Sequence, residues 1–445
     1  MLVREIVEAT KGKLICGDEN LDITGYSKDT RTIEAGDFYI PLVGASFDGH
    51  KFIESAFDQG AIGCITSHPM EKVEGKVIIE VENTTKALQD MAMYLRLHRN
   101  VKVVAITGSV GKTSTKDLVF SVISQKYKAL KTLGNYNNEI GLPLTILRMK
   151  DEEVLVLEMG MDYAGTISLL SYIARPDICL ITNVGTAHIG NLGSRENIMK
   201  AKLEIIDYMR ENGTLVINND NDMLHTYSDR AVRFGIENKS DIMANKVQSY
   251  EDGSIFECEG NTYYIHVPGS HFVLNALAAI AVGKQLDIEP ALMKQGIETF
   301  ELTKKRMDFY FLKNSMILID GSYNANVDSM KSSIEVLSKY EGKKMAILAD
   351  MLELGDFSEQ LHREVGRVLY ESKIDVVLCV GKESKFIVDS AEMNGLKNVH
   401  HFASNDALIN ALDQYLEEKM VVLVKGSQSM HLAEVSSFIM EKYKK

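Results

Sequence analysis

The chain has 445 residues, of which 45% are hydrophobic and 25% charged, and its formal net charge is −13 at pH 7. This length exceeds what one hydrophobic core supports, so we expect two to four domains. The acidic balance argues against general nucleic-acid binding, and no apolar run approaches the roughly 20 residues of a membrane-spanning helix.

The N-terminal segment 1–10 is amphipathic and carries acidic residues, unlike an export signal. The cysteines are odd in number, widely spaced and without a CxxC pair, which predicts reduced thiols in a cytoplasmic protein. They are Cys16, Cys64, Cys179, Cys258 and Cys379.

The predicted fold class is α/β, with three domains. Residues 1–98 predict a small α/β domain with glycine-rich turns, closed by an amphipathic helix that follows Val81 and ends near Arg99-Asn100. This end is the first expected hinge.

Residues 99–305 predict a central ATP-binding domain around a parallel sheet, because apolar strands alternate there with helical segments. The expected strands are 101–107, 154–157, 178–182 and 215–217, and the expected helices are 113–125, 195–209 and the Ala-rich 274–285. Between them, 230–268 predicts an antiparallel insert or edge.

Residues 306–445 predict a Rossmann-like, doubly wound domain, since each apolar strand there is followed by a helical pattern. The expected strands are 316–320, 345–348, 376–380 and 421–424.

A shortened phosphate-binding loop follows the first strand of the central domain. Residues 107–114 read TGSVGKTS, with Ile106 in place of the first glycine of the longer consensus. Backbone N–H groups of such a loop converge on phosphate oxygens at a helix N-terminus. The predicted nucleotide contacts are Gly108, Ser109, Val110, Gly111, Lys112, Thr113 and Ser114, with Lys112 on the β- and γ-phosphates and Thr113 on Mg²⁺.

Three downstream side chains are candidates for the same site. Glu158 and His188 follow strands of the same sheet, whose carboxyl edge is where such sites form. Glu158 is interpreted as an Mg²⁺ ligand. For His188, two interpretations are about equally favoured: a second metal ligand, or an ordinary packed or surface histidine. From the sequence pattern alone, Lys202 is predicted to be a solvent-exposed lysine on a helix, and the pattern does not distinguish it from Lys200.

The chain as a whole resembles the Mur ligase family, which builds the peptide of bacterial cell-wall precursors, and is most similar to its D-alanyl-D-alanine-adding branch. The motifs that carry the resemblance are DTR at 29–31, GDF at 36–38, FDGH at 47–50, GSVGKT at 108–113, GNYNNEIG at 134–141, EMG at 158–160, NVGTAH at 183–188, GSRE at 193–196, AK at 201–202, GSHFVLNA at 269–276, YNAN at 323–326, DMLELG at 350–355 and KGS at 425–427.

The resemblance implies roles for individual residues. Lys202 matches a lysine carried as a carbamate that bridges to Mg²⁺, Asn275 an adenine contact, and Arg306 a γ-phosphate contact from the hinge. The implied catalytic set is Lys112, Glu158, His188, Lys202 and Arg306, and the implied metal ligands are Thr113, Glu158, His188 and Lys202. Asn138, Asn275, Arg306 and Asp320 join the ATP contacts, and the precursor and acceptor contacts are Thr30, Arg31, Asn135, Asn137, Tyr323 and Asn326.

The resemblance also implies the reaction. An ATP-dependent, ADP-forming ligase with two Mg²⁺ ions would join D-Ala-D-Ala to UDP-N-acetylmuramoyl-tripeptide through an acyl phosphate. We expect a cytoplasmic monomer, without membrane insertion, that serves peptidoglycan synthesis and thereby cell shape and division.

Three departures from the family pattern keep alternatives open. An expected acid pair reads Asp320-Gly321, the hinge reads Lys305-Arg306-Met307 without its glycine, and 428–433 reads QSMHLA. The alternatives are a paralogue with another amine acceptor, the tripeptide-forming sibling or a folylpolyglutamate synthase, a non-catalytic nucleotide-binding scaffold, and a simple NTPase.

Overall fold

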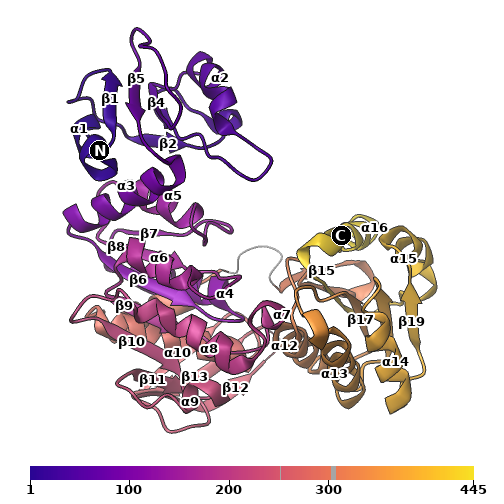
Figure 1. The fold of residues 1–445 in the computed structure, drawn as a ribbon. Helices are drawn as coiled ribbons and strands as arrows, with labels where there is room; N and C mark the ends of the chain where they lie inside the picture. Colours follow the sequence, from indigo (N-terminus) through magenta and orange to yellow (C-terminus); the bar gives the residue numbers. More distant parts are fainter. Residues whose placement is uncertain (251, 302–306, 445) are drawn as a thin grey trace.

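A computed structural model describes residues 1–250, 252–301 and 307–444 and arranges them as three α/β units, each with its own sheet (Figure 1). This confirms the predicted three-domain α/β architecture. The exact boundaries at 98/99 and 305/306 remain predictions, and the second falls outside the described residues. In the part of the chain that is described, no helix has the length and apolarity to cross a bilayer.

The first unit has a five-stranded sheet in the order β1-β5-β4-β3-β2, in which only β1 runs antiparallel to its neighbour. Its elements are α1 (Val3–Thr10), β1 (Lys13–Cys16), β2 (Gly25–Ser27), η1 (Thr30–Thr32), β3 (Asp37–Tyr39), η2 (Gly49–Phe52), α2 (Ile53–Asp58), β4 (Gly63–Thr66) and β5 (Val77–Glu80).

Helix α3 (Thr84–His98) joins the first unit to the second. Asn83 caps it by accepting the backbone N–H of Lys86 at 2.8 Å. It packs against α1 on one side and against α5 (Gly141–Leu147) and α6 (Thr166–Ala174) of the central unit on the other. The expected helix after Val81 is thus confirmed, with an end at His98.

The central sheet has nine strands in the order β14-β13-β12-β11-β10-β9-β6-β8-β7. The strands are β6 (Lys102–Thr107), β7 (Ala129–Lys131), β8 (Val154–Glu158), β9 (Ile178–Ile181), β10 (Thr214–Asn218), β11 (Val232–Gly235), β12 (Ile242–Ser249), β13 (Ser254–Cys258) and β14 (Asn261–Ile265). The helices are α4 (Lys112–Ile123), α5 (Gly141–Leu147), α6 (Thr166–Ala174), α7 (Ile189–Leu192), α8 (Arg195–Leu203), η3 (Glu204–Ile206), α9 (Asp222–His225), α10 (Ser270–Gln285) and α11 (Pro290–Glu298).

Burial on both faces explains why the central strands are apolar throughout. Along β6, Val103 and Ala105 enter the core shared with α3, α5 and α6, whereas Val104 and Ile106 enter the core shared with α4 and α10. Side chains alternate between faces, so a strand covered on both sides loses its polar positions.

Two expectations for this unit needed correction. The segment 230–268 is antiparallel only from β12 onward, because β11 runs parallel to both β10 and β12. The helix expected over 195–209 ends at Leu203, where the 3₁₀ turn η3 follows.

The third unit has a six-stranded sheet in the order β15-β16-β20-β17-β18-β19, parallel except for β15. Its elements are β15 (Asp308–Phe311), η4 (Lys313–Ser315), β16 (Ile317–Asp320), α12 (Val327–Ser338), β17 (Lys344–Ala349), η5 (Gly355–Phe357), α13 (Ser358–Glu371), β18 (Val376–Val380), α14 (Lys385–Asn394), β19 (Val399–Phe402), α15 (Asn405–Ala411), η6 (Leu412–Gln414), β20 (Val421–Lys425), η7 (Gln428–Met430) and α16 (Ala433–Lys442). The expected doubly wound pattern is confirmed.

A buried arginine fixes α3 to the central sheet. The side chain of Arg96 is fully buried and donates to the carbonyls of Ala174 and Val101 at 2.9 and 3.0 Å, and to the Asp177 carboxylate at 2.8 Å. Burial is the main cause that lowers the pKa of Arg96. The charge is tolerated because acceptors surround it.

We therefore expect Arg96→Ala to lower the free energy of unfolding by about 3–5 kcal/mol, because buried carbonyls lose their donor and the Asp177 carboxylate loses its buried cationic partner, keeping the Val103 N–H. Lys102→Ala is the matched control, since Lys102 approaches the same Asp177 at 3.4 Å from an exposed position. It should cost less than about 1 kcal/mol. Urea unfolding of both variants checks this, and equal losses would contradict it.

Candidate active site

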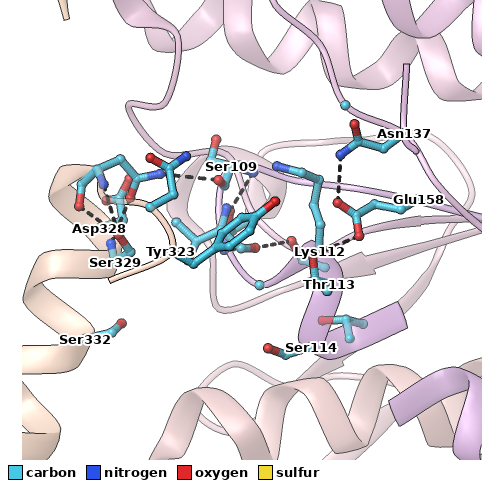
Figure 2. A pocket seen from close by; sticks show the side chains of 18 of the residues that line it. Ser109, Lys112, Thr113, Ser114, Asn137, Glu158, Tyr323, Asp328, Ser329 and Ser332 are labelled. Carbon is cyan, nitrogen blue, oxygen red and sulfur yellow. Dashed lines mark hydrogen bonds between the residues drawn. The ribbon is translucent and has the colours of Figure 1, made fainter. Parts of the chain in front are cut away.

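A cavity of about 580 Å³ lies between the central and C-terminal units, at the carboxyl edge of the central sheet (Figure 2). It brings together most of the predicted site residues from both units. Those that line it are Ser109, Val110, Gly111, Lys112, Thr113, Ser114, Asn135, Asn137, Asn138, Glu158, His188, Asn275, Tyr323 and Asn326.

The phosphate-binding loop is shaped by two glycines. Gly111 caps α4 in the left-handed conformation at φ 79°, which a side chain disfavours. At Gly108 a Cβ atom would lie 1.9 Å from the Thr182 hydroxyl, so only glycine fits there. The Lys112 ammonium donates to the Gly108 carbonyl at 2.8 Å, which folds its side chain back over the loop.

Asn183 braces the loop from the next strand. Its side-chain oxygen accepts the backbone N–H groups of Ser109 and Val110 at 3.0 and 2.9 Å. Sequence reasoning placed Asn183 only inside a motif and gave it no role. The available signal was its position directly after β9, beside the loop.

The Glu158 carboxylate lies at the end of β8 and is almost fully buried. It accepts the Thr113 hydroxyl on one oxygen and the Asn137 amide on the other, both at 2.9 Å. Figure 2 shows Asn137, Glu158 and Thr113 joined in this way. The Lys116 ammonium, which no pattern singled out, lies 3.7 Å from the same carboxylate.

Lys202 and Lys200 differ in burial, which sequence could not reveal. Lys202 is 1% exposed, whereas Lys200 is exposed. Burial, and then the nearby charge of Lys112, lowers the pKa of Lys202 well below its ordinary value. A neutral, nucleophilic amine is therefore favoured at this position.

His188 meets the C-terminal unit. It adopts a left-handed backbone conformation at φ 63°, and its Nδ1 lies 2.8 Å from Glu353 and 3.7 Å from Asp162. The nearby His188 imidazole lowers the pKa of Glu353 despite partial burial. The three side chains place their polar atoms within 4.8 Å of one another.

Two asparagines predicted to contact ATP have clear positions. The Asn275 side-chain oxygen accepts the Thr115 hydroxyl at 3.0 Å, which ties α10 to α4 beneath the loop. Asn138 accepts the backbone N–H of Gly141 at 2.8 Å. Both still line the cavity.

In the C-terminal unit, Gly321 lines the cavity, whereas Asp320 is 1% exposed and accepts the backbone N–H of Ser322 at 3.0 Å. A Cβ at Gly321 would lie 3.5 Å from the Lys425 ammonium. A contact between Asp320 and the ribose therefore has no support from the lining of this cavity. Tyr323 reaches toward the phosphate loop in Figure 2.

Five of the predicted site residues that the structure describes do not line this cavity: Gly108, Lys202, Asp320, Thr30 and Arg31. Thr30 and Arg31 lie in η1 of the first unit, where Arg31 pairs with Asp29 at 2.6 Å. Nearby Lys28 lies 6.0 Å from the ring centre of Tyr136, so this part of the first unit faces the segment that carries Asn135 and Asn137. Arg306 lies outside the described residues.

His271 lies in the first turn of α10 and lines the cavity. Burial lowers its pKa from 6.5 to about 4, although the negative charge of Glu335 opposes that shift. The imidazole is therefore neutral in the folded chain at pH values where it is protonated in the unfolded chain.

The unfolded state thus binds more protons between pH 6.5 and about 4, so the free energy of unfolding should fall as pH drops through this window, by up to about 3 kcal/mol. His271→Gln should lose less stability than the parent between pH 7 and pH 4.5. Denaturant titrations at both pH values measure this, and parallel losses would show that His271 is not the cause.

Known proteins resemble this chain over nearly its full length. Residues 106–283 match the family model for the Mur ligase middle domain, and residues 305–428 match that for the Mur ligase, glutamate ligase domain. The UDP-N-acetylmuramoyl-tripeptide--D-alanyl-D-alanine ligase of Bacillus subtilis strain 168 is 38% identical over 448 residues, which covers 99% of this chain and 98% of that protein.

Two solved structures share the fold. MurF from Acinetobacter baumannii superposes with a TM-score of 0.90 at 28% identity, covering 99% of this chain and 98% of that one. MurF ligase from Thermotoga maritima, solved in complex with ADP, gives 0.84 at 29% identity, covering 94% of this chain and 98% of that one.

Proposed function

This chain belongs to the Mur ligase family, and we propose that it joins D-alanyl-D-alanine to UDP-N-acetylmuramoyl-tripeptide with hydrolysis of ATP to ADP and phosphate. The Bacillus subtilis relative carries this activity in its name and matches 99% of the chain, and MurF from Acinetobacter baumannii covers the same share. The observation that carries the proposal is the shared cavity, where a lysine-tipped phosphate loop faces Glu158 and the Tyr323–Asn326 segment.

The reaction has two steps. A carboxylate oxygen of the tripeptide attacks the γ-phosphorus of ATP, so that an acyl phosphate forms and ADP leaves. The neutral amine of D-Ala-D-Ala then attacks the acyl carbon, phosphate leaves with the bonding electrons, and the new amide nitrogen loses one proton, which the released phosphate takes up.

The first step brings two anions together, and this chain supplies positive charge where they meet. Backbone N–H groups of the loop and the Lys112 ammonium bind phosphate oxygens, and Arg306 would add a second cation from the hinge. The acyl phosphate is lost if water reaches it. Closure of the C-terminal unit over the loop excludes that water.

The residues present fit divalent cations. The Thr113 hydroxyl and Glu158 carboxylate lie 2.9 Å apart, both oxygen donors of the kind that Mg²⁺ prefers. His188 and Lys202 would serve a second ion, with Lys202 as a carbamate formed when its neutral amine attacks CO₂ and loses a proton. Bound Mg²⁺ would offset the negative charge of the phosphates.

The first unit is proposed to hold the UDP end of the precursor, with Thr30 and Arg31 as contacts. Tyr323, Asn326, Asn135 and Asn137 are proposed to contact the peptide and its acceptor. The site is proposed to act in a monomer in the cytoplasm, where its product feeds peptidoglycan synthesis and so cell-wall growth, cell shape and division.

Acceptor dependence tests the proposed function. Purified protein with ATP, Mg²⁺ and UDP-N-acetylmuramoyl-tripeptide should release phosphate only when D-Ala-D-Ala is added, and far less with D-Ala or L-amino acids. The Lys112→Ala control should release none, because the γ-phosphate loses its principal cation. Phosphate release without acceptor would indicate an NTPase, and preference for another amine would indicate a paralogue.

Carbamylation of Lys202 has a separate test. Lys202→Ala should reduce ligase activity at least about 100-fold, because a proposed anionic metal ligand is lost. Millimolar acetate or formate should restore part of the activity by placing a carboxylate in the vacated space. Lys200→Ala, two residues away and exposed, is the control that should stay active. Full activity of Lys202→Ala without any additive would remove Lys202 from the site.

A further inference from the structure

The start of α12 contacts the loop that follows β9, and the residue that caps α12 contacts the phosphate loop (Figure 2). One Asp328 carboxylate oxygen accepts the backbone N–H of Thr186 at 3.0 Å and the Thr186 hydroxyl at 3.4 Å. Two residues earlier, the Asn326 amide donates to the Ser109 carbonyl of the phosphate loop at 3.4 Å.

Gly185 makes this approach possible. A Cβ atom at Gly185 would lie 2.0 Å from the Asp328 carboxylate, so any side chain there would displace the acid. The backbone N–H of Gly185 in turn donates to the Ser109 hydroxyl at 2.9 Å. Asp328 therefore contacts a segment that is itself hydrogen-bonded to the phosphate loop.

The geometry of α12 holds Asp328 in place. Asn326 caps the helix by accepting the backbone N–H of Ser329 at 2.9 Å, and the Ser329 hydroxyl accepts the backbone N–H of Asn326 at 3.0 Å. This reciprocal cap fixes the first turn, where an acidic residue is also favoured by the helix dipole. Asp328 thus projects from a rigid helix start.

A cationic side chain holds the loop that Asp328 contacts. Arg195 of α8 donates to the Val184 carbonyl of this loop at 2.7 Å. Its pKa is raised mainly by the hydrogen bond to Asp222, with a further contribution from the negative charge of Asp328. The contact is therefore complementary in charge as well as in shape.

We propose that Asp328 is a positioning residue for the ligase reaction: it docks the C-terminal unit on the Gly185–Thr186 segment and so holds the Tyr323–Asn326 segment against the phosphate loop. The consequence for catalysis rests on the proposed function, whereas the docking itself does not. Asp328 accepts hydrogen bonds from Thr186 in the loop after β9, so its effect should fall on closure rather than on ADP binding.

Asp328→Ala should lower kcat of the ligase reaction at least about tenfold and change the dissociation constant of ADP less than about twofold, because the phosphate loop itself is intact. Small-angle X-ray scattering with ADP and Mg²⁺ should show a larger radius of gyration than the parent. Asp328→Asn keeps an acceptor oxygen and should recover most of the kcat. Thermal unfolding checks that each variant is folded.

Asp406→Ala is the matched control. Asp406 occupies the same position in the first turn of α15, two residues after the Ser404 cap, and is exposed. The Asp406→Ala substitution removes an acidic residue from the first turn of a helix away from the central unit. The kcat and the radius of gyration of this variant should therefore match those of the parent.

Gly185→Ala approaches the contact from the other side. It should reproduce the Asp328→Ala defect, and the double variant should be no worse than either single one, since both remove the same contact. Parent-like kcat and scattering in Asp328→Ala, or additive defects in the double variant, would overturn the docking role. If the parent lacks ligase activity but scattering still separates it from Asp328→Ala, the proposed function fails and the docking contact stands.

Discussion

The hydrogen bond between Thr113 and Glu158 joins the start of α4 to the end of β8, and the rest of the site is arranged around that junction. A buried carboxylate needs compensation, because desolvation disfavours its charge. Lys116 lies 3.7 Å from Glu158 and 3.4 Å from Asp117, and Asp117 accepts from Lys131 at 2.8 Å. Two lysines thus balance two acids beneath the phosphate loop, and the site can gain cations and phosphates without first burying an unpaired charge.

Lys112 and Lys202 present the opposite situation, because two lysines interact electrostatically, one partly buried at the cavity and the other fully buried. The Lys112 ammonium donates to the Gly108 carbonyl at 2.8 Å. Lys202 is the partner that burial favours in the neutral form, as the direction of its pKa indicates. The same packing that would make Lys202 costly as a cation makes it a suitable amine for reaction with CO₂.

Much of this organisation was predictable because local patterns carried it. Long apolar runs identified the central strands, and the glycine and lysine spacing identified the phosphate loop, since both follow from short-range geometry. Short strands such as β7 and β19 were missed because three or four residues hold too little periodicity. The burial of Lys202 and Lys116 depends on which helix face meets the sheet, and the contact of Asn183 depends on which loop lies beside the phosphate loop. The sequence pattern alone predicts neither.

The role of Asp328 was equally hidden, because it depends on two units meeting across 142 residues of sequence. Neither Gly185 nor Asp328 is unusual in its own segment. Their importance becomes visible only in the folded structure, where the loop that carries Gly185 lies against the helix that carries Asp328.

Helix α3 has a consequence for how modular this architecture is. One of its faces completes the core of the first unit and another covers α5 and α6, while Arg96 is anchored in carbonyls beyond the hinge. Residues 1–98 therefore do not form a module that can be exchanged without changing the central unit. Transplanting them onto another ATP-binding core would require a matching groove for α3, and recombination between distant homologues would be better tolerated within a sheet's outer loops than at this junction.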